Sequence, residues 1–201
     1  MSRLISTVVV CLLALGSIAA AQENHMDVAV SGVGFFTSDS SGNGLTQSQS
    51  GSGGLLASFR YGIGHHSAVE LNYGFTRNSQ TFTDGFFPIA EQQANVHEFT
   101  ADYVLHLRRF HKLNPFVLAG GGALVFSPIT NSAASIPFAD TQSKGTFLYG
   151  AGVNYALLGN LGLRLQYRGL VYKTPDFGNN LFSTDSWTHT AEPTLGITFR
   201  F

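Results

Sequence analysis

The sequence predicts an all-β protein: an eight-stranded antiparallel up-and-down transmembrane β-barrel, preceded by a cleaved signal peptide. Three observations lead to this fold class. Segments with a period of two run through the chain, the connections between them alternate between long and short, and only 11% of the 201 residues are charged. Soluble domains contain roughly 25% charged residues, so the low value favours a chain that is solvated partly by lipid.

The first residues have the layout of a secretory signal peptide. Arg3 gives a weakly positive start, an apolar run covers residues 4–18, and three alanines at 19–21 supply the small residues of a cleavage site. The run is shorter than the roughly 20 apolar residues that a membrane anchor needs. We therefore expect a signal peptide over residues 1–21 and a single barrel domain over residues 22–201.

The composition after the signal peptide excludes several classes of protein. Cys11, the only cysteine, lies in the signal, so the mature chain cannot form a disulfide. Loss of Arg3 leaves 10 basic against 12 acidic residues, a formal charge of −2 that offers no basic excess for nucleic acid. No later apolar run is long enough for a transmembrane helix, which leaves a closed barrel as the way to cross a bilayer.

Eight segments have the length and pattern of strands. They cover residues 26–36, 52–62, 67–77, 95–107, 115–126, 144–156, 161–172 and 187–201. The links are long at 37–51, 78–94, 127–143 and 173–186, and short at 63–67, 108–114 and 158–160. Strict alternation is expected when tight turns lie on the periplasmic side and extended loops lie outside.

The period of two is clearest in the last strand. Its apolar face carries Ala191, Pro193, Leu195, Ile197, Phe199 and Phe201, and its polar face carries Glu192, Thr194, Gly196, Thr198 and Arg200. Successive side chains of a strand point to opposite faces. Each such strand therefore has one oily and one polar side. The strand over residues 26–36 is ambiguous, because small residues occupy both of its faces.

The charged residues indicate which side faces the lipid. The polar faces of the strands collect four basic and four acidic side chains: Arg60, Glu70, Glu98, Asp102, Arg164, Arg168, Glu192 and Arg200. A soluble barrel with its oily side inward is the alternative, but its surface charges need no such balance. Charges enclosed in a narrow lumen do need it, because an unpaired buried charge is costly. We predict a lumen charge network of these eight residues.

Aromatic side chains near the strand ends predict two girdles at the membrane interfaces. Toward the long loops these are Phe36, Phe75, Phe126, Phe147 and Trp187; toward the short turns they are Tyr61, Phe116, Tyr155 and Phe201. Glycines inside the strands, at 120–122, 150 and 152, suit a small barrel that curves sharply.

These features resemble the OmpA/OmpX-like family of eight-stranded outer-membrane barrels, above all in the alternating final strand over residues 194–201. The resemblance implies the outer membrane of a Gram-negative bacterium, periplasmic termini, and outer-membrane lipids as partners. In this family a terminal aromatic residue is the signal for the barrel-assembly machinery. Phe201, with Phe199 before it, is the expected counterpart here.

Catalytic, cofactor-binding and metal-binding residues are not expected. His189 lies near the outer rim, but its neighbours do not form the His/Ser pair with a carboxylate that lipid A deacylase barrels use. His65, His66 and His111 lie on the first two short turns without a carboxylate, which is a weak metal pattern.

The predicted function is that of a non-enzymatic outer-membrane protein whose surface loops serve envelope structure, adhesion or surface interaction. A narrow pore or passive transporter is the first alternative, and a lipid-modifying enzyme is the second. The sequence indicates no particular extracellular ligand.

Overall fold

The computed structural model describes residues 26–42, 45–49, 51–83, 88–129, 141–174 and 186–201. The predicted signal peptide lies outside these residues. This described part of the chain contains ten strands: β1 (Met26–Thr37), β2 (Ser40–Gly42), β3 (Leu45–Gln49), β4 (Ser52–Gly62), β5 (Ser67–Thr83), β6 (Pro88–His106), β7 (Leu113–Ile129), β8 (Gln142–Leu158), β9 (Leu161–Lys173) and β10 (Trp187–Arg200).

Eight of these strands close into an antiparallel barrel, which confirms the predicted fold class. The hydrogen-bonded order runs β5, β4, β1, β10, β9, β8, β7, β6, and pairing of β5 with β6 completes the circle. Closure leaves no free sheet edge, so backbone hydrogen bonds are satisfied within the barrel wall. Within the described residues there is no helix long and apolar enough to span a membrane.

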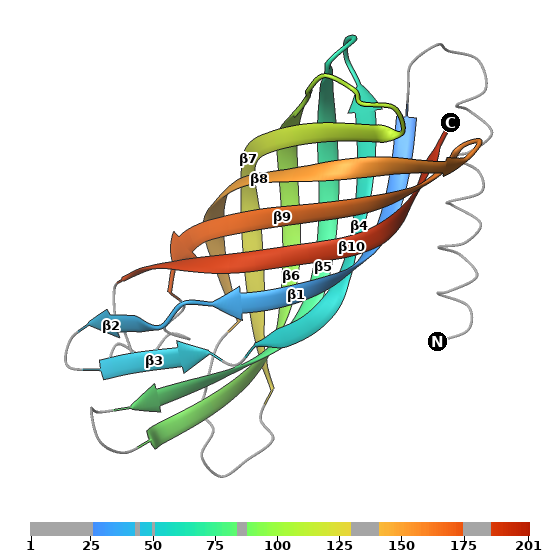
Figure 1. Cartoon of the computed structure of the whole chain (residues 1–201). Helices are drawn as coiled ribbons and strands as arrows, with labels where there is room; N and C mark the ends of the chain where they lie inside the picture. The colour runs from blue at the N-terminus through green and yellow to red at the C-terminus, as the bar shows by residue number, and fades with distance from the viewer. Residues whose placement is uncertain (1–25, 43–44, 50, 84–87, 130–140, 175–185) are drawn as a thin grey trace.

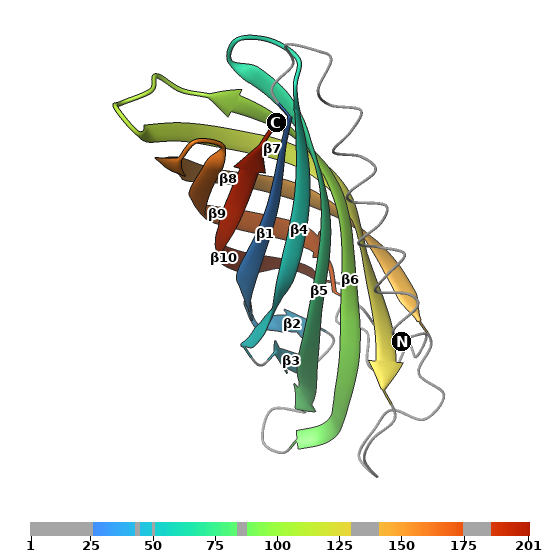
Figure 2. The same cartoon turned by 90° about the vertical axis from the view of Figure 1, so that its right-hand side faces the viewer.

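The barrel has two different ends (Figures 1 and 2). The short turns β4–β5, β6–β7 and β8–β9 lie at the end where β10 finishes, and we call this end the turn mouth. There the Phe201 amide donates to the carbonyl of Met26 at 2.8 Å, which ties the last residue to the first strand. The opposite, outer end carries β2, β3 and the far parts of β5 and β6 (Figure 1).

The predicted long link over residues 78–94 is wrong in one respect. β5 and β6 continue through most of it, pairing from Asn78 with Ala94 up to Thr83 with Pro88. β3 adds a further strand beside β5, from Gln49 opposite Gln80 to Thr46 opposite Thr83. The segment has no alternating apolar residues to mark it as a strand, yet the end of β5 pairs with β3 on one side and with β6 on the other, and this extends the sheet.

Outward-facing side chains form an apolar wall. Leu195, Ile197 and Leu165 are 60%, 56% and 56% exposed, and such exposure around a whole barrel is expected only where lipid is the solvent. The girdle prediction fails for Phe116 and Phe126, which are buried in the lumen at 1% and 0% exposure. β7 is apolar on both faces, so its sequence pattern does not indicate which of its residues point inward.

Two glycines of β7 show why the wall needs residues without side chains. A Cβ atom on Gly120 would lie 2.1 Å from the carbonyl oxygen of Ala101, and one on Gly122 would lie 2.0 Å from that of Phe99. The close approach of β6 and β7 therefore requires glycine at both positions.

Candidate functional site

The lumen near the turn mouth holds an ion-pair group built around Arg164. Its Nη2 atom lies 2.6 Å from Asp27 Oδ1, and its Nη1 atom lies 2.8 Å from Glu70 Oε2. Arg60 contributes a second guanidinium to the same carboxylate, with Nε donating to Glu70 Oε2 at 2.7 Å. These four side chains, which we call the mouth group, come from β1, β4, β5 and β9. They cross-link strands on opposite sides of the wall.

A second ion-pair group lies at the centre of the barrel. Arg168, completely buried, binds Glu98 through Nη2 and Glu192 through Nη1, the latter at 3.0 Å. Its Nη2 atom also donates to the Thr100 hydroxyl at 3.0 Å. Buried charges are tolerated when they are paired and hydrogen-bonded. The central group meets that condition at both Nη atoms of Arg168, whereas its buried Nε atom has no hydrogen-bond partner among the described residues.

Asp102 lies between the two groups without an arginine partner. Its Oδ2 atom accepts a hydrogen bond of 2.6 Å from Asn72, which accepts one of 2.6 Å from the Ser58 hydroxyl. Amide and hydroxyl groups on the polar faces thus extend the network that the charges begin.

The structure brings seven of the eight predicted lumen charges together inside the lumen and places the eighth, Arg200, at the rim of the turn mouth. Arg200 lies half-exposed at the turn mouth and makes no ion pair among the described residues. The mouth group also contains an acidic residue, Asp27, that the sequence pattern did not select. Asp27 lies opposite both Arg60 and Arg200 in the strand register, but the small residues after it left the facing of β1 open.

The outer half of the lumen contains an apolar layer beside buried threonines such as Thr188 and Thr190, and the sequence did not reveal this layer. Six buried side chains pack there, each at most 1% exposed, and we call them the apolar layer: Phe35, Leu124, Phe126, Leu148, Leu170 and Tyr172. The rings of Phe126 and Tyr172 lie 5.8 Å apart. The Tyr172 hydroxyl is hydrogen-bonded to Thr190 at 2.9 Å, so its polar atom is satisfied inside the layer.

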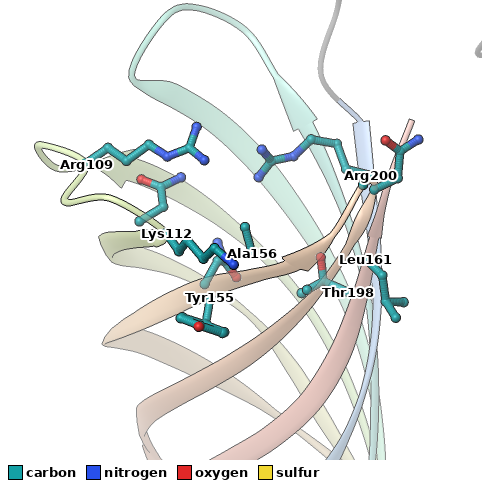
Figure 3. A pocket seen from close by; sticks show the side chains of 12 residues that line it. Arg109, Lys112, Tyr155, Ala156, Leu161, Thr198 and Arg200 are labelled. Atoms are coloured by element: carbon teal, nitrogen blue, oxygen red, sulfur yellow. The ribbon is translucent and has the colours of Figure 1, made fainter.

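At the turn mouth the barrel opens into a cavity of about 240 Å³. Its polar lining includes Arg60, His65, His66, His106, Arg109 and Arg200. A smaller pocket beside it, of about 50 Å³, shares Arg109 and Arg200 and adds Lys112. Figure 3 shows the side chains of Arg109 and Arg200 extending toward one another across this pocket, from the β6–β7 turn and from β10.

His189, the candidate that the sequence places near the outer rim, lies beside a tyrosine. His189 Nε2 is hydrogen-bonded to the Tyr149 hydroxyl at 3.0 Å on the exposed outer wall. Tyr73 and His97 form a similar pair at 3.0 Å. Such pairs suit an interface where one side of a ring meets lipid and its polar tip meets water. No group of three or more metal-ligating side chains occurs in the described part of the chain.

Chemically, this arrangement fills the lumen. The mouth group, the central group and the apolar layer lie one above another, and their largest side chains have almost no accessible surface. An eight-stranded lumen is just wide enough to be filled by side chains. The groups left accessible are those of the outer end and the turn mouth.

The chain matches a known protein family. The family model "Outer membrane protein beta-barrel domain" matches residues 7–201. No curated protein sequence matches the chain significantly.

Solved structures resemble the fold at low sequence identity. Neisserial surface protein A aligns with a TM-score of 0.62 at 15% identity, over 88% of this chain and 97% of that one. The attachment invasion locus protein Ail of Yersinia pestis, in complex with the heparin analogue sucrose octasulfate, aligns with a TM-score of 0.55 at 16% identity, over 90% and 100%. OprG of Pseudomonas aeruginosa aligns with a TM-score of 0.58 at 12% identity, over 89% and 96%.

Proposed function

Because this chain belongs to the outer membrane protein β-barrel domain family, we propose that it is a closed, non-enzymatic barrel that presents a surface-interaction platform outside the cell. Its location is the bacterial outer membrane, as the family and the apolar outer wall agree.

The filled lumen is the observation that carries the proposal. Arg168 is 0% exposed at the centre, and Phe126 and Tyr172 are 0% exposed above it. Solute passage would have to separate buried ion pairs and displace the apolar layer, and breaking one buried pair costs about 3–5 kcal/mol. This packing favours a scaffold over the pore alternative.

The outer end supplies the platform. β2, β3, β5 and β6 pair side by side there and extend the sheet beyond the barrel. A paired backbone is a stiffer support for a binding surface than a loop of equal length, because fewer conformations are lost on binding. Residues 45–49 and 79–83, on β3 and β5, are rich in Ser, Thr and Gln, a composition suited to adaptable hydrogen bonding.

The charge of the long links, read from the sequence, suggests what kind of partner such a platform accepts. Residues 38–51, 77–95, 127–144 and 173–186 carry six acidic side chains against three basic ones: Asp39, Asp84, Glu91, Asp140, Asp176 and Asp185 against Arg77, Lys144 and Lys173. The Ail structure, which resembles this fold, contains a heparin analogue, and this ligand is a polyanion. This chain's acidic excess disfavours such a ligand and favours a neutral or basic protein surface.

Two measurements test the proposal. The purified protein is expected to give no single-channel steps in planar bilayers, and regular steps would refute the closed scaffold. Cells that express the protein are expected to adhere to surfaces coated with a basic protein more than vector-only cells do. Heparin-coated surfaces should show no such gain.

A hairpin variant locates the adhesion. Replacing residues 79–93 by Asn-Gly puts a two-residue turn between Asn78 and Ala94, which already face each other in the ladder. The variant should keep heat-modifiable gel mobility and lose the adhesion gain. Equal adhesion of the variant and the wild type would remove the platform from the proposal.

A further inference from the structure

We infer that the turn mouth is a binding site for a phosphate-type oxyanion, held by Arg109 and Arg200 over the mouth group. This site lies at the end of the barrel opposite to the proposed platform, and it does not depend on that function. Three observations carry the inference: the charge around the cavity, the way Arg109 is held, and an unsatisfied buried donor.

The charges around the mouth do not cancel. Four guanidinium groups, those of Arg60, Arg164, Arg109 and Arg200, surround or underlie the cavity. Asp27 is the one carboxylate among the described lining residues, and Arg164 already holds it at 2.6 Å. Glu70, the other carboxylate of the mouth group, is shared between two arginines. Concave sites with an excess of one sign concentrate counter-ions of the opposite sign.

Arg109 is held in position for this role. His111 has a φ of 52°, in the left-handed region, and its carbonyl accepts a hydrogen bond of 3.1 Å from Arg109 Nε. The bond fixes the side chain at Nε and leaves the two Nη groups to reach across the pocket, toward Arg200 (Figure 3). A planar guanidinium with two parallel N–H groups is suited to bidentate contact with phosphate oxygens.

The floor of the cavity offers a further donor. Arg60 is 1% exposed and lines the cavity, and its buried Nη1 atom has no hydrogen-bond partner among the residues that the structure describes. A buried donor without a partner is costly, and a bound anion is one way to satisfy it. Asn114 also lines this cavity and adds a polar amide to it. Its Nδ2 atom lies 3.3 Å from Nδ1 of His106.

Two sources could provide the oxyanion. One is the headgroup of a phospholipid in the inner leaflet, and the other is a free phosphate or phosphorylated solute. Phosphorus NMR titration distinguishes them: the detergent-folded protein is titrated with inorganic phosphate and, separately, with dihexanoyl phosphatidylglycerol, at constant ionic strength in chloride. We expect saturable shifts with at least one probe, and the tighter probe identifies the source.

Arg108 provides a matched control, because it is exposed, lies next to Arg109 on the same turn and does not line either cavity. R109Q and R200Q are each expected to raise the Kd about tenfold, the effect of losing one charge-assisted hydrogen bond. R108Q removes the same charge and should leave the Kd within about twofold. Heat-modifiable gel mobility checks that each variant is folded. If R200Q does not fold, the comparison of R109Q with R108Q is sufficient to test the inference.

Two results would overturn the inference. One is the absence of saturable shifts with either probe in the wild type. The other is an equal loss in R108Q and R109Q, which would mean that a diffuse positive field and not a built site attracts the anion.

Discussion

Replacing Arg168 by methionine removes the cation between Glu98 and Glu192 and keeps most of the side-chain volume. Both carboxylates are almost fully buried, with side-chain exposures of 4% and 2%. The variant therefore leaves two negative charges together in the lumen. Removal of one partner from a buried ion pair costs about 3–5 kcal/mol, and we expect a loss of that size in the free energy of unfolding.

Urea unfolding in phospholipid vesicles measures this loss. Trp187, the only tryptophan, lies on the outward face of β10 at 65% exposure, so its fluorescence reports whether that strand is in lipid. With a slope of about 2 kcal/mol per molar urea, the midpoint of R168M should fall by roughly 2 M. R77M is the control, because Arg77 is exposed and hydrogen-bonds to Asn95 at 3.2 Å. Its loss should stay below about 1 kcal/mol.

A rescue variant separates charge from packing. In R168M/E98Q/E192Q both carboxylates become neutral amides of the same shape, so most of the lost stability should return. The reasoning is refuted if R168M costs less than about 1 kcal/mol. It is also refuted if the triple variant is no more stable than R168M, because the loss would then come from packing.

The remaining predictions concern the barrel wall and the last residue. G120A should lower the yield of folded barrel, because the new Cβ would meet the Ala101 carbonyl at 2.1 Å, whereas G145A, with nothing within 4 Å of its Cβ, should fold like the wild type on a heat-modifiability gel. F201A should slow assembly in cells, followed by pulse–chase, and leave refolding in detergent unchanged, if Phe201 is the assembly signal. The same change at Phe110, an aromatic residue 59% exposed in a turn, should slow neither process.

The sequence by itself determined the architecture of this protein. The period of two is a local property, because it depends only on the residues of one strand. Leu195 and Ile197 point to the lipid as that period predicts. The lengths of the links were enough to assign the short turns to one end. The sequence also placed Phe201 at the end of the last strand, where its ring packs on Phe199 at 5.0 Å.

The tertiary structure decided which inward residues meet, because alternation gives the facing of a side chain but not the stagger of one strand against the next. That stagger puts Asp27 within reach of Arg164 and leaves Arg200 at the turn mouth. β7 is apolar on both faces, and the direction in which Phe116 and Phe126 point is determined only by the register with the neighbouring strands. The ion-pair groups, the apolar layer and the mouth cavity all depend on closure of the barrel, which no single strand encodes.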